Sequence, residues 1–231
     1  MQVFQRAVAL ALLALLALPA AAFAQSDDAQ FAVGAGLGTT GYDLMASYKV
    51  LDNLNVRGTL SGLNYSRDGD YNTDTHYNGK FKLFQTGVLA DYFPFGNSFR
   101  MSGGLALNQT KLGLQASAGS STTYRLNGNT YYSNQVGDLD GEAKWNKPAL
   151  YLGLGFGNSV KNKGLSLSGD FGVLLTGKPD TTLTASCTSA LSAAQCQQLQ
   201  NDVGVEQNKL RDDTNKLNFW PVARLTLNYA F

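Results

Sequence analysis

The chain has little histidine, cysteine or net charge, and each shortage excludes a class of function. Its 231 residues include one histidine and two cysteines, and 18 basic residues against 17 acidic ones leave a formal charge of +1. A balanced charge provides no basic surface for nucleic acid. The single histidine, His76, lies near Asp68, Asp70 and Asp74, so a nucleophile and its base would have to be assembled in that one segment. We therefore expect no enzyme.

Long apolar runs are also missing beyond the N-terminus. Residues 7–18 form an apolar run of about a dozen residues, shorter than the ~20 that a membrane-spanning helix needs. Ala22 and Ala24 form a small-x-small cleavage site, which predicts a secretory signal peptide over residues 1–24. The rest, 25–231, is then one exported domain. If that domain lies in a membrane, the closed β-barrel is the structure left to it, because it contains no candidate helical span.

The C-terminus supports a membrane barrel. Its last residues alternate strictly, with apolar side chains on one face and mostly polar ones on the other: Leu225, Leu227, Tyr229 and Phe231 against Arg224, Thr226, Asn228 and Ala230. Period-2 alternation is typical of a strand wetted on one face. A soluble domain that ended on such a strand would expose an open edge, whereas closure of a lipid-facing barrel removes it. We expect assembly machinery of the outer membrane to recognise this strand, which ends at Phe231.

The mature chain contains eight alternating segments of the length that a tilted membrane strand requires. They span residues 30–38, 42–50, 54–65, 80–93, 99–108, 149–157, 165–176 and 219–231. In the fourth segment Phe81 and Leu83 lie on the face opposite Phe84 and Val88, and a β-bulge near Phe84 would reconcile them. The fold class is therefore all-β, an eight-stranded antiparallel up-and-down transmembrane β-barrel.

The connections alternate in length, which predicts the orientation. Residues 51–53, 95–98 and 158–164 are short turns, as expected on the periplasmic side, whereas 66–79, 109–148 and 177–218 are long, as expected outside the cell. The chain should thus lie in the outer membrane of a Gram-negative bacterium, in contact with lipid and lipopolysaccharide. Lysines that border the long connections either meet lipid phosphates or are simply solvated: Lys80, Lys82, Lys144 and Lys147.

The inward faces of the predicted strands carry charges of both signs. The set comprises Asp43, Lys49, Arg57, Asp91, Arg100, Asp170 and Arg224. An isolated buried charge costs several kcal/mol, so these groups should pair. An eight-stranded barrel is just wide enough for its own side chains. The lumen is therefore either a sealed, salt-bridged core or a charged path that opens transiently for a small solute.

Two long connections contain predicted structure of their own. Thr123–Tyr132 indicates a hairpin on the Asn127-Gly128 turn. Residues 192–217 have a helical spacing of Leu199, Val203, Leu210 and Leu217. This helix either lies over the barrel mouth or presents a surface to a partner. Because the protein is exported, we expect one disulfide, Cys187–Cys196.

Two kinds of segment superficially resemble cofactor- or metal-binding motifs, but each lacks a feature that the motif requires. The two Gly-x-Gly-x-Gly runs, 34–38 and 153–157, place their glycines on one strand face with no helix behind them. The acidic segment 68–79 has Thr73 and Gly79 where a calcium loop of the EF-hand type needs glycine and glutamate. We expect no cofactor and no metal.

Short segments along the chain, in this order, resemble those of a known family: Gly38–Tyr42, Leu126–Tyr131, Tyr151–Phe156, Thr176–Pro179 and Trp220–Val222. The chain resembles the carbapenem-associated outer-membrane proteins (CarO, the ornithine-uptake porin) over nearly all of the mature sequence. The resemblance implies an eight-stranded barrel with elaborate outer loops that takes up small and basic amino acids. Asp170 matches an acidic position in the seventh strand of the family and Arg224 a basic one in its eighth. The Cys187–Cys196 segment and the loop lengths depart from the family.

Together these observations predict a porin-like barrel that lets small polar solutes pass slowly, basic amino acids among them. The inward carboxylates Asp43, Asp91 and Asp170 would favour a cation, with Arg57, Arg100 and Arg224 holding them in place. The alternative is a sealed structural barrel that binds ligands or surfaces through its outer loops.

Overall fold

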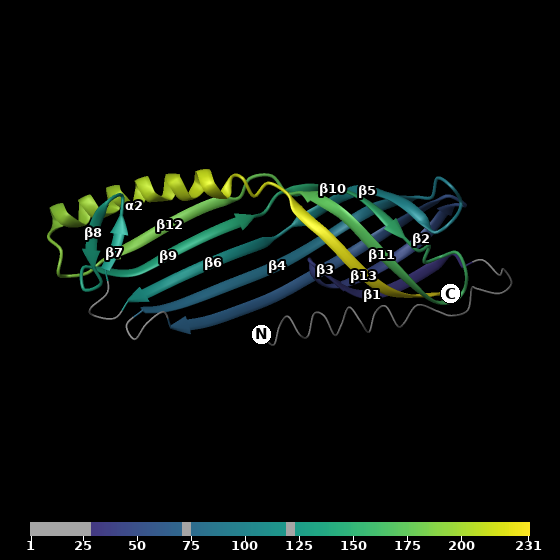
Figure 1. Cartoon of the computed structure of the whole chain (residues 1–231), viewed down its shortest axis with the longest axis horizontal. Helices are drawn as coiled ribbons and strands as arrows, with labels where there is room; N and C mark the ends of the chain where they lie inside the picture. Colours follow the sequence, from purple (N-terminus) through teal and green to yellow (C-terminus); the bar gives the residue numbers. More distant parts are fainter. Residues whose placement is uncertain (1–28, 71–74, 119–122) are drawn as a thin grey trace.

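The computed structural model describes residues 29–70, 75–118 and 123–231, and its elongated shape has two parts (Figure 1). One part is a closed barrel. The other, which we call the extension, continues from the barrel along the long axis as a sheet with a helix beside it. The predicted signal peptide and part of the acidic segment, residues 71–74, lie outside the described residues.

Eight antiparallel strands form the barrel, which confirms the predicted fold class. They are β1 (Phe31–Gly38), β2 (Gly41–Leu51), β3 (Leu54–Asp70), β4 (Thr75–Tyr92), β5 (Phe99–Asn108), β10 (Pro148–Phe156), β11 (Gly164–Leu175) and β13 (Trp220–Ala230). Each pairs with the next in this order, and β13 pairs with β1 to close the ring. Closure leaves neither the first nor the last strand with an open edge, as a strand in lipid requires.

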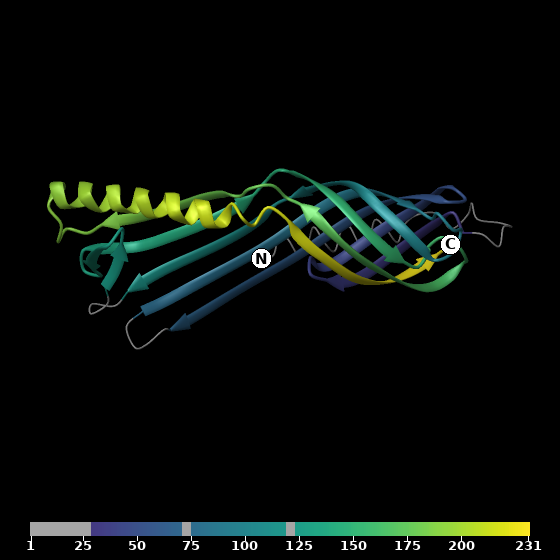
Figure 2. The same ribbon diagram turned by 45° about the horizontal axis from the view of Figure 1, so that its top comes forward.

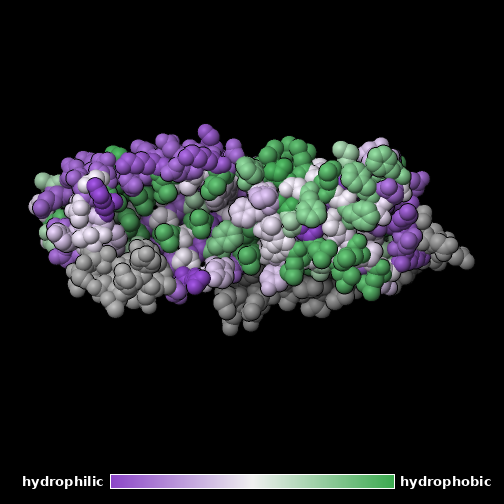
Figure 3. All heavy atoms as spheres, viewed as in Figure 1, coloured by the Kyte–Doolittle hydropathy of each residue, from purple (hydrophilic) through white to green (hydrophobic). Residues whose placement is uncertain are grey.

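The side chains alternate as predicted. In β13 Leu225, Leu227 and Tyr229 are exposed, whereas Thr226 and Asn228 are buried inside the ring. Figure 3 shows apolar side chains gathered on the barrel half and hydrophilic ones along the helix of the extension. The barrel is thus apolar where it meets lipid and polar inside.

Strand β4 continues past the barrel without the predicted bulge. Its register with β3 is unbroken from Leu54↔Tyr92 to Asp70↔His76, so the prediction of a bulge near Phe84 was wrong. Leu83 is buried on the inward face and Val88 is exposed on the outward face of this one continuous strand. Its partner on the other side changes: residues 85–92 of β4 pair with β5, and residues 75–82 pair with β6. Phe81, on the inward face, stacks on Trp220 with ring centroids 6.1 Å apart.

Strands occupy much of the connections that the sequence indicated as loops. The far halves of β3 and β4 join β6 (Thr110–Ala118), β9 (Val136–Trp145) and β12 (Asp180–Cys187) in the order β3-β4-β6-β9-β12. Only Gln109 separates β5 from β6, so a barrel strand runs almost directly into the extension. The predicted hairpin is confirmed as β7 (Thr123–Leu126) and β8 (Asn129–Tyr132), with positive φ at both turn residues, Asn127 and Gly128.

The predicted helix is α2 (Ala193–Thr214), which begins at a capping box formed by Ser192 and Gln195. It packs on β12 and contacts β7, and Figure 2 shows it running along the extension, not across the end of the barrel. Leu199 and Val203 enter a core with Tyr124, Leu126, Tyr131 and Val136. The predicted disulfide, Cys187–Cys196, ties the end of β12 to the first turn of the helix. The extension therefore has a core of its own.

None of the helices in the described part of the chain is long and apolar enough to cross a membrane.

Candidate functional site: the charged lumen

Two arginines and two aspartates from four strands meet inside the barrel. Arg57 lies on β3, Asp91 on β4, Arg100 on β5 and Asp170 on β11, each at an inward position of the alternation. All four side chains are at most 5% exposed. We call these four residues the lumen cluster.

Asp170 is the centre of the lumen cluster. One of its carboxylate oxygens accepts a hydrogen bond from Arg57 Nη1 at 2.8 Å. The other accepts from Arg57 Nη2 at 3.0 Å and from Arg100 Nη2 at 2.8 Å. Arg57 also donates to Asp91 at 2.9 Å, and Ser102 donates to the same oxygen at 2.5 Å. Paired donation by a planar guanidinium to one carboxylate is the strong form of this contact, so each charge in the cluster is compensated.

A second pair lies nearer the extension. Arg224 Nε is 3.0 Å from Asp43 Oδ1. Thr40 donates to both oxygens of that carboxylate, at 3.2 and 3.1 Å, and Ser61 donates to Oδ1. Asp43 and Arg224 are buried. This pair and the lumen cluster together contain six of the seven charged residues that the sequence placed on the inward faces.

Glycines make room for the cluster. A Cβ at Gly155 would lie 2.7 Å from Arg100 Nε, and one at Gly172 would lie 2.7 Å from the Tyr151 hydroxyl. A methyl group at Gly155 would force the Arg100 side chain to shift, and one at Gly172 would also lie 2.5 Å from the backbone oxygen of Leu152. The columns of glycine that superficially resemble nucleotide loops serve the packing of the lumen instead.

Buried apolar side chains are packed on both sides of the lumen charges. Toward the extension an apolar layer fills it, formed by Leu89, Ala106, Ala149, Tyr151, Leu174 and Val222, with Trp220 packed against them. At the opposite end, which we call the turn end, Val160 from the β10–β11 turn is fully buried against Ala29, Ala32 and Ala230. Asn55 joins that turn by a hydrogen bond to Asn158 at 3.1 Å. A solute would have to displace side chains to cross.

Sequence reasoning missed the neutral partners of these charges. Ser102, Ser61 and Thr40 each donate to a lumen carboxylate. The sequence pattern could have identified the two serines, because Ser102 and Ser61 lie on the same strand faces as Arg100 and Arg57. Lys49, also predicted inward, lies at the turn end with Asp52 at 3.1 Å and is not part of the cluster.

Some buried donors in the lumen have no hydrogen-bond partner within the described part of the chain. They include the Tyr151 hydroxyl and Arg224 Nη1. An unsatisfied buried donor costs about 1–3 kcal/mol, so these atoms favour an acceptor from outside the chain. Among the residues described, no group of histidine, cysteine and acidic side chains has the arrangement of a metal site.

Two solved structures share the fold of this chain. The chain is similar to the crystal structure of Acinetobacter baumannii CarO, with 21% identity, a TM-score of 0.58, and coverage of 90% of this chain and 100% of that one. Acinetobacter baumannii CarO2 is similar at 20% identity and the same TM-score, with 89% and 100% covered. No family model matches the sequence, and no curated protein matches it. The fold is therefore CarO-like.

Proposed function

We propose that this chain is an outer-membrane, porin-like barrel that admits small polar solutes slowly, basic amino acids among them. The observation that carries the proposal is Asp170, a buried carboxylate on β11 held by Arg57 of β3 and Arg100 of β5. A solute ammonium or guanidinium group could take the place of either arginine at this carboxylate.

The geometry also offers a partner for the other end of an amino acid. Arg224 Nη1 and the Tyr151 hydroxyl are buried donors without a hydrogen-bond partner in the described residues. A solute carboxylate could accept from them while its cationic side chain reaches Asp170 or Asp43. A zwitterion with a basic side chain fits these charges better than a neutral sugar.

The closed pairs account for slow passage. Removing one partner from a buried ion pair costs about 3–5 kcal/mol, and each ~1.4 kcal/mol is a factor of ten. A state with one pair open would then be populated at about one part in a hundred to one in a few thousand. Such a barrel passes solutes occasionally and does not conduct like a wide porin.

The test is uptake of ornithine and glycine into proteoliposomes that contain the refolded chain. Asp170→Asn should lower the ratio of ornithine to glycine flux by about tenfold, since the carboxylate that receives the cation is lost. Asp180→Asn, an exposed carboxylate of the extension, is the matched control and should leave the ratio unchanged. An unchanged ratio in Asp170→Asn, with folding confirmed by heat-modifiable gel migration, would remove Asp170 from the path.

A second candidate is a sealed barrel whose function is binding at the extension. The observation that favours it is the separate core of the extension, with its own disulfide. A segment that only connects two barrel strands requires neither a core nor a disulfide of its own. Native proteoliposomes that take up neither solute, although the chain is folded, would favour this candidate.

A further inference from the structure

Four successive rows of side chains run up the outward face of β3, β4 and their neighbours. The lowest row pairs Ala46, Gly58, Val88 and Leu105, and the next pairs Leu44, Leu60, Thr86 and Leu107. Phe84 and Gln109 follow, joined by a backbone hydrogen bond of 2.8 Å. The uppermost row pairs Lys82, Lys111 and Lys144. Because each step is two residues, the face changes from apolar to cationic within about 20 Å along the strand.

The three lysines are direct cross-strand neighbours, an arrangement that by itself is unfavourable. Like charges that face each other across a sheet destabilise it. Glu142 forms ion pairs with Lys111 and Lys144, so the three lysines and this glutamate together carry a net charge of +2. Asp180, the cross-strand neighbour of Lys144, forms an ion pair with Lys147 at 3.3 Å. Burial tends to raise the pKa of Glu142, but hydrogen bonds from the two lysines outweigh it and hold the pKa below its ordinary value. Glu142 therefore remains a carboxylate that bridges Lys111 and Lys144.

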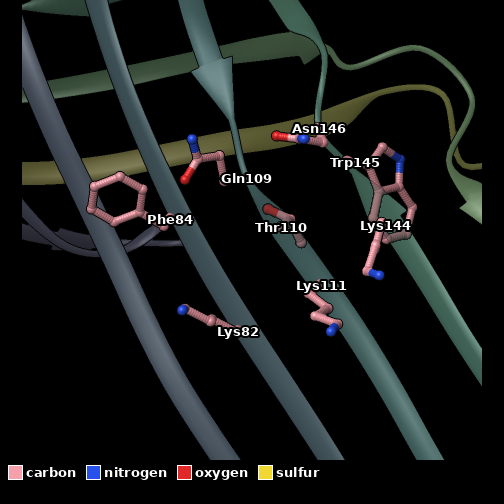
Figure 4. A pocket seen from close by; sticks show the side chains of 8 residues that line it. All are labelled: Lys82, Phe84, Gln109, Thr110, Lys111, Lys144, Trp145 and Asn146. Atoms are coloured by element: carbon pink, nitrogen blue, oxygen red, sulfur yellow. The ribbon is translucent and has the colours of Figure 1, made fainter. Parts of the chain in front are cut away.

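A pocket of about 370 Å³ lies at the lysine row, and Phe84 and Gln109 form part of its lining. Lys82, Lys111 and Lys144 line one side of it, and Phe84, Gln109 and Asn146 the other (Figure 4). Its volume lies within the range of small-molecule sites. Three ammonium groups, two amides and an aromatic ring suit a phosphate on a sugar.

A groove of about 690 Å³ lies directly below, on the same outward face. Its lining includes Ala46, Gly58, Leu60, Thr86, Val88 and Leu107, almost all of it apolar. A Cβ at Gly58 would meet nothing within 4 Å, so the missing side chain opens the groove. In the outer membrane such a groove meets acyl chains.

We propose that this face binds one phosphorylated glycolipid of the outer leaflet, lipopolysaccharide, with a lipid A phosphate between Lys82, Lys111 and Lys144 and an acyl chain in the groove over Gly58. The positive charge of the lysines complements the phosphate of the headgroup. The apolar groove, which lies next to the pocket on the same face, would hold the acyl chain. A bound phosphate would reduce the repulsion among the three lysines and so stabilise the sheet where it leaves the membrane. This role is independent of any passage through the lumen.

The test is retention of lipid A by the refolded full mature chain, counted by native mass spectrometry after detergent exchange. The native chain should retain one bis-phosphorylated lipid A. Lys82→Gln with Lys111→Gln and Lys144→Gln should lower the affinity by about tenfold to a hundredfold. The matched control, Lys161→Gln with Lys163→Gln and Lys178→Gln, removes three exposed lysines elsewhere and should bind like the native chain.

Gly58→Leu tests the groove without touching a charge. It fills open space on the lipid face, so the barrel should fold and lipid A retention should fall. Lipid A without phosphates should bind the native chain and the triple lysine variant equally weakly. Native-like retention by both the lysine variant and Gly58→Leu would overturn the proposal. Saturation of the site by inorganic phosphate alone would also overturn it, since the ligand would then be a free anion.

Discussion

At the scale of single residues, the lumen is organised by pairs that the chain order does not reveal. Asp170 and Arg224 are cross-strand neighbours on β11 and β13, yet Arg224 pairs with Asp43 and Asp170 with Arg57, 113 residues away. Alternation along a strand predicts which side chains point inward, and six of the seven predicted charges are buried in the lumen. Which of them meet depends on how the ring closes, and no local pattern contains that information.

The room around Arg100 gives a prediction at this scale. Gly155→Ala should destabilise the barrel by about 1–3 kcal/mol, because its Cβ would displace a guanidinium that Asp170 holds. Gly103→Ala on the lipid face is the control, since its Cβ would lie 3.7 Å from Leu152. Urea unfolding in detergent micelles measures both. Equal midpoints for the two variants would show that the lumen tolerates the added methyl group.

At the scale of elements, the hairpin and the helix of the extension were predicted from local signals. The Asn127-Gly128 turn and the Ser192 capping box are short-range features, and both form. The strands β6, β9 and β12 were missed because their identity depends on distant neighbours: β4 must extend beyond the barrel before β6 can pair with it. The apolar stripe of α2 is only partly buried, since Leu199 and Val203 enter the core whereas Leu210 remains exposed.

Asp202 joins the hairpin to the helix. Its carboxylate accepts hydrogen bonds from Tyr131, from Asn129 at 2.7 Å and from Asn127 at 3.0 Å. Asp202→Asn should therefore release β7–β8 and speed its amide hydrogen exchange about tenfold or more, with the barrel strands unchanged. Asp213→Asn, an exposed carboxylate on the same helix, is the control. Equal protection of the hairpin in both variants would contradict this role.

The same contact predicts a pH dependence. Hydrogen bonds from Tyr131, Asn127 and Asn129 hold the pKa of Asp202 well below its ordinary value, while burial and the Asp202 carboxylate raise the pKa of Tyr131 to about 12. A carboxyl with a lowered pKa stabilises the fold above its unfolded pKa of about 3.9 and loses that contribution as the pH falls further. The difference in hairpin exchange between the native chain and Asp202→Asn should persist at pH 5 and shrink below about pH 4. A difference that does not change with pH would contradict the account.

At the scale of the whole molecule, two long strands, β3 and β4, run through two structures with separate cores. β4 forms the barrel wall with β5 and then the extension with β6. The barrel was predictable from composition, alternation and the final strand, because lipid imposes the same rule on every spanning segment. The extension obeys no such rule, so its architecture follows only from tertiary pairing.

The most direct test of the central claim, that the ion pairs of the lumen open only transiently for small cations, is single-channel recording in a planar bilayer. The refolded mature chain should show rare, small openings that ornithine alters and glycine does not. A silent bilayer with demonstrably folded protein would contradict the claim and assign the function to the extension. Large, steady conductance would contradict it equally, because a lumen closed by buried ion pairs cannot conduct continuously.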